Sequence, residues 1–195
     1  MIAIIDLGIG NFASVKKALD GKVTVNPEII KKADKLVLPG VGNFGEVAKK
    51  LKPLKEIILR KIETGTPFLG ICLGMHLLFP SSAEGRGEGL GVLAGEVSSL
   101  PREASPHIGW NQVFPEGEDP LLSDLVPGSF FYFVHSYYPN PEDGCVVTGR
   151  TEYKTAGKVR TFPATVRQEN VFGVQFHPEK SSEKGLRILE NFKQL

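Results

Sequence analysis

Cys72 is the strongest candidate for a reactive residue, because glycines stand two positions before it and two positions after it. The stretch Gly70-Ile71-Cys72-Leu73-Gly74 follows an apolar run typical of a strand and precedes a run typical of a helix. A G-x-C-x-G sequence in such a setting matches the tight turn that carries the nucleophile of many hydrolases, with sulfur replacing the serine oxygen. We therefore predict that Cys72 is a nucleophile. The alternative is a buried structural cysteine with glycine neighbours.

Two features of this predicted turn would help a thiol to react. A helix that begins directly after Cys72 favours negative charge there and so raises the thiolate fraction. The backbone N–H of Leu73 points toward whatever lies over the sulfur, so it can donate one hydrogen bond to an oxyanion.

The second oxyanion donor is expected from the turn Gly40-Val41-Gly42, which follows another predicted strand. Its glycines let backbone N–H groups approach a substrate closely. Taken alone, this turn could instead bind phosphate, but no Lys-Ser or Lys-Thr pair follows it. We predict that the backbone of this turn completes the oxyanion hole.

A cysteine nucleophile needs a base within hydrogen-bond reach and a third group that orients the base. His177 stands at the end of an apolar strand in VFGVQFHPEKS, and open α/β sheets build their sites at this edge. Pro178 keeps the chain extended, so Glu179 lies on the same side as His177. The predicted triad is therefore Cys72, His177 and Glu179.

The other three histidines are weaker candidates for the base. His76 shares a helix face with Cys72 and can line the pocket, but no residue near it in the sequence would orient it. His107 and His135 each follow a strand-like stretch or a turn. Each of these two is either a satisfied structural histidine or a pocket residue.

Alternating strands and helices in the first half of the chain are expected to position these residues. Strands are predicted at 2–6, 22–26, 35–39 and 67–71. Helices are predicted at 11–19 and 44–63, the second one broken at Pro53. Apolar strands separated by helices indicate a mostly parallel, doubly wound α/β sheet flanked by helices.

After Gly89 the pattern changes to short strands separated by turn residues. Strands are predicted at 91–100, 129–138, 145–153, 159–168 and 171–176, and a closing helix at 183–195. These strands are expected to be partly antiparallel, as an extension of the sheet or a small second sheet. A chain of this length is most simply one domain, so we expect a single domain over residues 1–195.

Composition argues against several classes of protein. The 41% hydrophobic and 23% charged residues are those of an ordinary soluble globular protein. A net charge of +1 gives no electrostatic reason to propose nucleic acid or a membrane as a partner. Two distant cysteines predict no disulfide scaffold and fit the reducing cytoplasm. The apolar start is interpreted as a strand rather than a signal peptide, and the longest apolar run, 68–79, is too short to span a bilayer.

Three segments, GICLGMHLL, LPGVGNF and FGVQFHPEKS, carry a resemblance to a known family. Their order and spacing resemble those of the class I glutamine amidotransferases over nearly all of the chain. Within that class the chain is similar to the glutaminases of imidazole glycerol phosphate synthases. The narrower likeness is carried by IDLGIGNFASVKKAL, PHIGWN, FYFVHSY and the Lys180-Ser181 pair after HPE. The resemblance implies the α/β fold of that class.

The resemblance also implies a mechanism. Cys72 would attack the side-chain amide of L-glutamine, His177 would give a proton to the nitrogen that departs as ammonia, and water would hydrolyse the glutamyl thioester that is left. Leu73, with Val41 or Gly42, would stabilise the oxyanion. Glu84 would hold the α-ammonium group of the substrate. The backbone around Ser136 and Tyr137 would receive the α-carboxylate.

Further implications concern the rest of the substrate site and the partner. Gly40 and His76 would be substrate-binding residues, and His76 stands where the family usually carries a substrate-binding glutamine. A neutral imidazole nitrogen donates or accepts one hydrogen bond, whereas an amide does both. The ammonia would pass to a (β/α)₈-barrel cyclase subunit of histidine biosynthesis, with no cofactor and no metal.

Two alternative functions are also compatible with the sequence. One is the glutaminase of another biosynthesis, such as that of anthranilate or pyridoxal phosphate, against which PHIGWN and the Lys180-Ser181 pair argue. The other is a flavodoxin-like binding or redox module whose cysteine is incidental.

Overall fold

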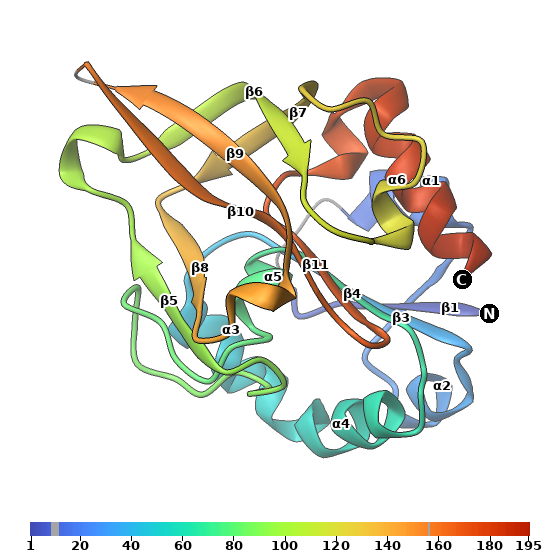
Figure 1. Ribbon diagram of the computed structural model, residues 1–195. Helices are drawn as coiled ribbons and strands as arrows, with labels where there is room; N and C mark the ends of the chain where they lie inside the picture. Colours follow the sequence, from blue (N-terminus) through green and yellow to red (C-terminus); the bar gives the residue numbers. More distant parts are fainter. Residues whose placement is uncertain (9–11, 156) are drawn as a thin grey trace.

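The computed structural model describes residues 1–8, 12–155 and 157–195, and Figure 1 shows how their elements are arranged. The helices are α1 (Phe12–Leu19), α2 (Pro27–Lys32), α3 (Phe44–Leu51), α4 (Lys55–Glu63), α5 (Leu73–His76) and α6 (Ser182–Gln194). Short 3₁₀ turns are η1 (Lys52–Leu54), η2 (Arg102–Ala104), η3 (Pro120–Leu122), η4 (Gly144–Val146) and η5 (Pro178–Lys180).

The strands form a large sheet and a small one. They are β1 (Ile2–Ile5), β2 (Lys22–Thr24), β3 (Lys35–Gly40), β4 (Phe68–Cys72), β5 (Gly95–Ser99), β6 (His107–Pro115), β7 (Ser129–His135), β8 (Tyr137–Pro141), β9 (Val147–Thr155), β10 (Lys158–Gln168) and β11 (Val171–Val174). The large sheet runs β2-β1-β3-β4-β11-β10-β9-β6-β7, and β5 pairs with β8 in the small sheet.

In the large sheet the strand pairing changes from parallel to antiparallel at β11. From β2 to β11 all neighbours are parallel, and from β11 to β7 all neighbours are antiparallel. The predicted parallel, doubly wound sheet with an antiparallel extension is therefore confirmed.

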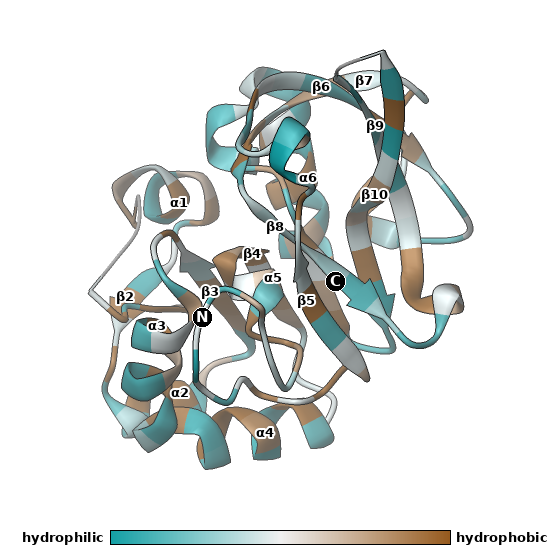
Figure 2. Ribbon diagram, turned by 90° about the vertical axis from the view of Figure 1, so that its left-hand side faces the viewer, coloured by the Kyte–Doolittle hydropathy of each residue, from teal (hydrophilic) through white to brown (hydrophobic). Residues whose placement is uncertain are grey.

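Helices cover both faces of the parallel half of the sheet. Alternate strand residues point to opposite faces, and apolar residues on both faces are buried. In β3, Leu36 and Leu38 pack in the core that includes residues of α2, α3 and α4. Val37, between them, packs in the other core with residues of α1 and α6. Figure 2 shows both hydrophobic and hydrophilic residues along α3 and α4, as expected of helices with one buried side.

The sequence prediction located most elements of the first half correctly. The predicted break at Pro53 is confirmed, since η1 separates α3 from α4. The helix predicted at 11–19 is described from Phe12 onward. Residues 9–11, which carry part of the segment IDLGIGNFASVKKAL, lie outside the described residues.

Three elements differ from the sequence prediction. Helix α2 was missed, although Asn26 caps it by accepting a hydrogen bond from the Glu28 N–H, and Pro27 opens it. Strand β6 was missed, and it is held by pairing with β7 on one side and β9 on the other. The stretch 129–138, predicted as one strand, is divided at Ser136 because β7 pairs in the large sheet and β8 in the small one.

Strand register brings the three sequence motifs to one edge of the sheet. Gly40 at the end of β3 pairs with Cys72 at the end of β4. On the other side of β4, Val174 of β11 pairs with Ile71. The residues that follow all three strands therefore meet at the carboxyl edge, where parallel α/β sheets place their ligands.

A membrane-spanning segment would need a long apolar helix. None of the helices in the described parts of the chain is both long enough and apolar enough for that role.

Candidate active site

Cys72 lies on a strained turn between β4 and α5. Its φ is +53° and its ψ is −107°, a conformation that side chains rarely adopt and that marks functional sites. The predicted strand–turn–helix setting is confirmed, although α5 extends only from Leu73 to His76. The flanking glycines are required by close backbone contacts. A Cβ atom on Gly70 would lie 2.5 Å from the carbonyl oxygen of Gly74, and one on Gly74 would lie 1.7 Å from that of Leu38.

We expect Gly74→Ala to lower the free energy of unfolding by at least about 3 kcal/mol, because the backbone of β3 would have to shift. Gly144→Ala is the matched control, since a Cβ atom there meets nothing within 4 Å. Its effect should stay within about 0.5 kcal/mol. Denaturant unfolding of both variants checks this. Equal stability of the two would show that the turn does not need a glycine at position 74.

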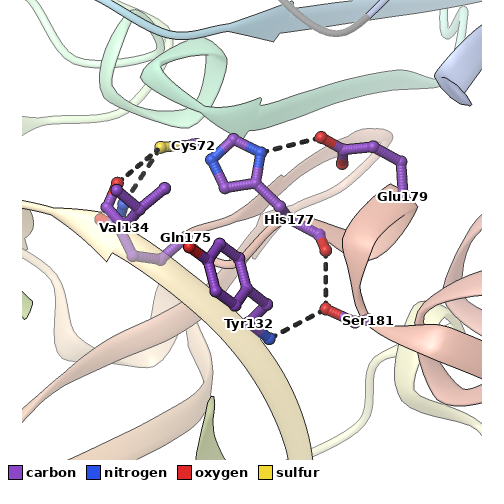
Figure 3. Close-up of polar contacts among 7 residues, drawn as sticks. All are labelled: Cys72, Tyr132, Val134, Gln175, His177, Glu179 and Ser181. Carbon is purple, nitrogen blue, oxygen red and sulfur yellow. Dashed lines mark hydrogen bonds and ion pairs between the residues drawn. The ribbon is translucent and has the colours of Figure 1, made fainter. Parts of the chain in front are cut away.

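The structure brings the three residues of the predicted triad together. Nδ1 of His177 lies 2.9 Å from Oε1 of Glu179, and both side chains are buried. The ring of His177 lies between Cys72 and Glu179, with one nitrogen facing each (Figure 3). The backbone supports this placement, because the hydroxyl of Ser181 donates to the His177 carbonyl at 2.6 Å and accepts from the N–H of Tyr132 at 3.0 Å.

The charge of His177 is set by its two neighbours. Burial alone lowers the pKa of His177, but its interactions with Cys72 and Glu179 raise it more strongly, to about 10. Nε2 of the ring is buried and has no hydrogen-bond partner within the described residues. These interactions favour the protonated ring, and Nε2, the nitrogen that faces the sulfur, is free to donate a hydrogen bond to a thiolate nucleophile.

Glu179→Gln should lower kcat for glutamine by roughly 10²–10⁴-fold, because a neutral amide orients the ring but no longer favours its charged form. The substitution removes the interactions of Glu179 that raise the pKa of His177, while the burial that lowers it remains. His177 should therefore lose its proton at a lower pH than in the unchanged protein, which NMR titration of the ring measures. Glu183→Gln, at an exposed position, is the control. A titration of His177 that does not move would contradict this account of its charge.

Gln175 also contacts the sulfur, and the sequence reading missed it. Its Nε2 lies 3.8 Å from Sγ of Cys72, and Sγ lies 3.9 Å from the carbonyl oxygen of Val134. Both contacts are drawn in Figure 3. The available signal was a polar residue between Val174 and Phe176, two positions before His177, since residues two apart in an extended chain face the same side.

A cavity of about 190 Å³ opens beside the sulfur. It is lined by Val41, Gly42, Cys72, Leu73, His76, Glu84, Val134, His135, Ser136 and Tyr137. Its volume is that of about six water molecules in the liquid, smaller than the about 300–1,000 Å³ of a site for a drug-sized ligand. A single small amino acid suits this volume better than a nucleotide does.

The predicted oxyanion and substrate residues surround this cavity, with one exception. Val41, Gly42 and Leu73 line it, and Gly42 has a φ of +105°, which favours glycine. Gly40 is buried behind them: a Cβ atom on it would lie 3.1 Å from Cβ of Leu73. Gly40, which we expected to bind substrate, therefore packs against Leu73 and is not among the residues that line the cavity.

Glu84 and the loop at Ser136–Tyr137 also line the cavity. Oε2 of Glu84 accepts a hydrogen bond of 2.7 Å from the N–H of Phe44, at the start of α3. Burial raises the pKa of Glu84, and the Phe44 N–H acts in the opposite direction. The loop is fixed by hydrogen bonds to its carbonyl groups, from the Leu100 N–H to Ser136 at 2.8 Å and from Nδ1 of His135 to Tyr137 at 2.8 Å.

His107 and His135 form a buried pair. Nδ1 of His107 lies 2.9 Å from Nε2 of His135. Because His135 donates through Nδ1 to the Tyr137 carbonyl, its Nε2 must accept from His107 when both rings are neutral. Burial lowers the pKa of His107 to about 4, and burial together with His107 lowers that of His135 well below its ordinary value. His107 is thus a satisfied structural histidine, and His135 also lines the cavity.

His76 lines the same cavity, and its ring is also hydrogen-bonded to Gln175. Its Nε2 lies 2.8 Å from Oε1 of Gln175. Burial lowers the pKa of His76 to about 4, although the hydrogen bond with Gln175 acts in the opposite direction. A neutral ring with this bond fits the expectation that His76 is not the base.

Across the parts of the chain that the structure describes, no three His, Cys, Asp or Glu side chains are grouped so as to hold a metal ion.

Comparison with protein families identifies this arrangement. The model of the class-I glutamine amidotransferases matches residues 9–195. The chain belongs to this family. Among curated proteins, it is 56% identical to the imidazole glycerol phosphate synthase subunit HisH of Pyrococcus furiosus, an alignment that covers 100% of this chain and 98% of the relative. It is 53% identical to the subunit of that name from Thermococcus kodakarensis, with 100% of both chains covered.

Solved structures with the same fold are more distant in sequence. A crystal structure of a glutamine amidotransferase superposes with a TM-score of 0.75 at 19% identity, covering 100% of this chain and 99% of the other. PurLQS from Thermotoga maritima gives a TM-score of 0.77 at 18% identity, covering 98% and 96%. The expected class I amidotransferase fold is confirmed.

Proposed function

We propose that this chain is the glutaminase subunit of an imidazole glycerol phosphate synthase and releases ammonia from L-glutamine. The observation that carries the proposal is a cysteine on a strained turn, Cys72, that faces the buried ring of His177, which Glu179 holds at 2.9 Å. The HisH relatives, which match over the full chain, support the choice of this synthase over one that makes anthranilate or pyridoxal phosphate.

The reaction proceeds in two halves through a covalent intermediate. In the first half, the thiolate of Cys72 attacks the side-chain amide carbon, and the negative charge moves to the carbonyl oxygen. Backbone N–H groups of Leu73 and of Val41 or Gly42 stabilise that oxyanion. When the carbon–nitrogen bond breaks, His177 gives its proton to the leaving nitrogen and ammonia departs.

In the second half, water hydrolyses the glutamyl thioester. His177, now neutral, takes a proton from the water as it attacks the thioester carbon, and a second oxyanion forms in the same place. Its collapse breaks the carbon–sulfur bond, which yields glutamate and returns the thiolate of Cys72 beside the imidazolium.

The cavity lining provides for the two ends of the substrate. The carboxylate of Glu84 binds the α-ammonium group, and the backbone of Ser136 and Tyr137 binds the α-carboxylate. His76 lies against the side chain, while Gly40 supports the loop above it. Residues 1–195 act as one amidotransferase domain, and a (β/α)₈-barrel cyclase subunit accepts the ammonia.

Affinity labelling tests this proposal directly. Diazo-oxonorleucine, a reactive glutamine analogue, should label Cys72 stoichiometrically in the subunit with its cyclase partner, and excess L-glutamine should protect it. Cys145 is an internal control, because it is exposed and the carboxylate of Asp143 raises its pKa. Peptide mass spectrometry locates the label. Equal labelling of both cysteines, or no protection by glutamine, would refute the assignment of Cys72.

A further inference from the structure

Gln175 connects His76 to the sulfur of Cys72 through its side-chain amide. The residue is fully buried. Its backbone is fixed too, because its N–H donates to the Ala164 carbonyl at 2.8 Å and continues the pairing of β11 with β10. The oxygen of the amide faces Nε2 of His76 at 2.8 Å, and its nitrogen faces Sγ at 3.8 Å.

The orientation of this amide sets the role of His76 in their hydrogen bond. With the amide nitrogen toward Sγ, the oxygen must accept, so Nε2 of His76 carries the proton that it donates. A neutral ring can hold that proton on Nε2, and burial keeps His76 neutral by lowering its pKa to about 4. The chain of donors therefore runs in one direction, from His76 to Gln175 to Cys72.

The groups around the sulfur suit different protonation states. The carbonyl oxygen of Val134 can only accept, so it interacts favourably with a thiol and unfavourably with a thiolate. The amide of Gln175 and the imidazolium of His177 donate, so both favour the thiolate. Gln175 is thus a neutral donor that offsets the Val134 carbonyl, whatever the charge of His177.

We propose that Gln175 is a positioning residue that holds the thiolate of Cys72, and that His76 keeps its amide in the donating orientation. The inference rests on the proposed role of Cys72 as the nucleophile. It gives His76 a second function, the orientation of the Gln175 amide, in addition to lining the cavity. A glutamine amide next to a buried sulfur affects the reactivity of the sulfur rather than the binding of substrate.

Gln175→Met tests this, because methionine has nearly the same shape and no N–H donor. At neutral pH the rate of Cys72 alkylation by iodoacetamide should fall about tenfold, as expected for the loss of one hydrogen bond to a charged group. The ultraviolet absorbance of the thiolate should fall as well. In the complex with the cyclase subunit, kcat for glutamate release should fall about tenfold while KM changes less than about twofold. Gln168→Met, at an exposed position, is the matched control and should change none of these.

His76→Leu gives an independent test if Gln175→Met folds poorly, which thermal unfolding would reveal. It should lower alkylation in the same direction but by less, because the amide can still donate part of the time. The double variant should be no slower than Gln175→Met alone. Alkylation at the unchanged rate in folded Gln175→Met would overturn the inference while leaving the proposed function intact. If Cys72 of the unchanged protein reacts no faster than Cys145, the proposed function itself fails.

Discussion

Cys72→Ser is expected to reduce glutamine-dependent activity by at least about 10⁴-fold and to leave ammonia-dependent synthesis by the complex within about twofold. Loss of the nucleophile of a catalytic triad typically costs about 10⁴–10⁶-fold in kcat. The serine hydroxyl is too weakly acidic to be present as an alkoxide beside His177, so restoring a similar shape does not restore reactivity. Ammonia supplied from solution bypasses this chemistry, because only the release of ammonia from glutamine uses the sulfur.

Two further variants make the experiment decisive. His177→Ala should lose as much glutamine-dependent activity as Cys72→Ser, and the double variant should lose hardly more, because the two residues act as a unit. Cys145→Ser should retain full activity, since Cys145 is exposed and lies apart from the cavity lining. Loss of both glutamine-dependent and ammonia-dependent synthesis in folded Cys72→Ser would instead assign Cys72 a structural role.

The residues near the nucleophile were predictable from the sequence because the contacts that require them are mostly between residues close together in the chain. A Cβ atom at Gly70 would collide with backbone of the turn, and one at Gly74 would collide with backbone of the neighbouring strand β3. The spacing of the glycines around Cys72 therefore indicates the turn directly. The pairing of His177 with Glu179 is similarly local, since the extended chain at Pro178 brings residues two apart to the same side.

Features that depend on strand pairing were not predictable in the same way. The sequence predicted an antiparallel extension but not that it starts at β11, nor the place of β6 between β7 and β9, because both come from pairings between segments far apart in the chain. The link from His76 through Gln175 to Cys72 joins residues 99 and 103 positions apart. No local pattern encodes these distances, because register is set by the pleat and by the packing of the whole sheet.

The pairing of His107 with His135 follows the same rule. Each histidine taken alone fits either a structural or a pocket role, and only the register of β6 with β7 places the two opposite each other. Once they are paired, the carbonyl of Tyr137 decides the direction of the hydrogen bonds. The two roles open to each ring could be predicted from the sequence, whereas its hydrogen-bond partner could not.

The isolated chain is expected to hydrolyse glutamine very slowly, and the cyclase subunit with its nucleotide ligand is expected to raise turnover at least about a hundredfold. The physical reason begins with ammonia. Most free ammonia becomes ammonium at neutral pH and loses its nucleophilic lone pair, so release into solution before the acceptor is bound would waste the substrate. A glutaminase that serves a separate subunit therefore benefits from remaining inactive until that subunit holds its ligand.

The turn at Val41–Gly42 is well suited to act as the switch. Gly42 already has a φ of +105°, and glycine can reorient its peptide groups at low steric cost. Loss of one oxyanion donor costs about 10²–10³-fold in kcat, so rotation of a single peptide group is a sufficient control. Gly42→Ala should therefore reduce the activation by the partner, whereas Gly144→Ala, at an unconstrained position, should not. Glutamate release by the chain alone, by the complex and by the complex with ligand measures the effect. Equal turnover in all three would contradict control by the partner and leave a glutaminase that acts on its own.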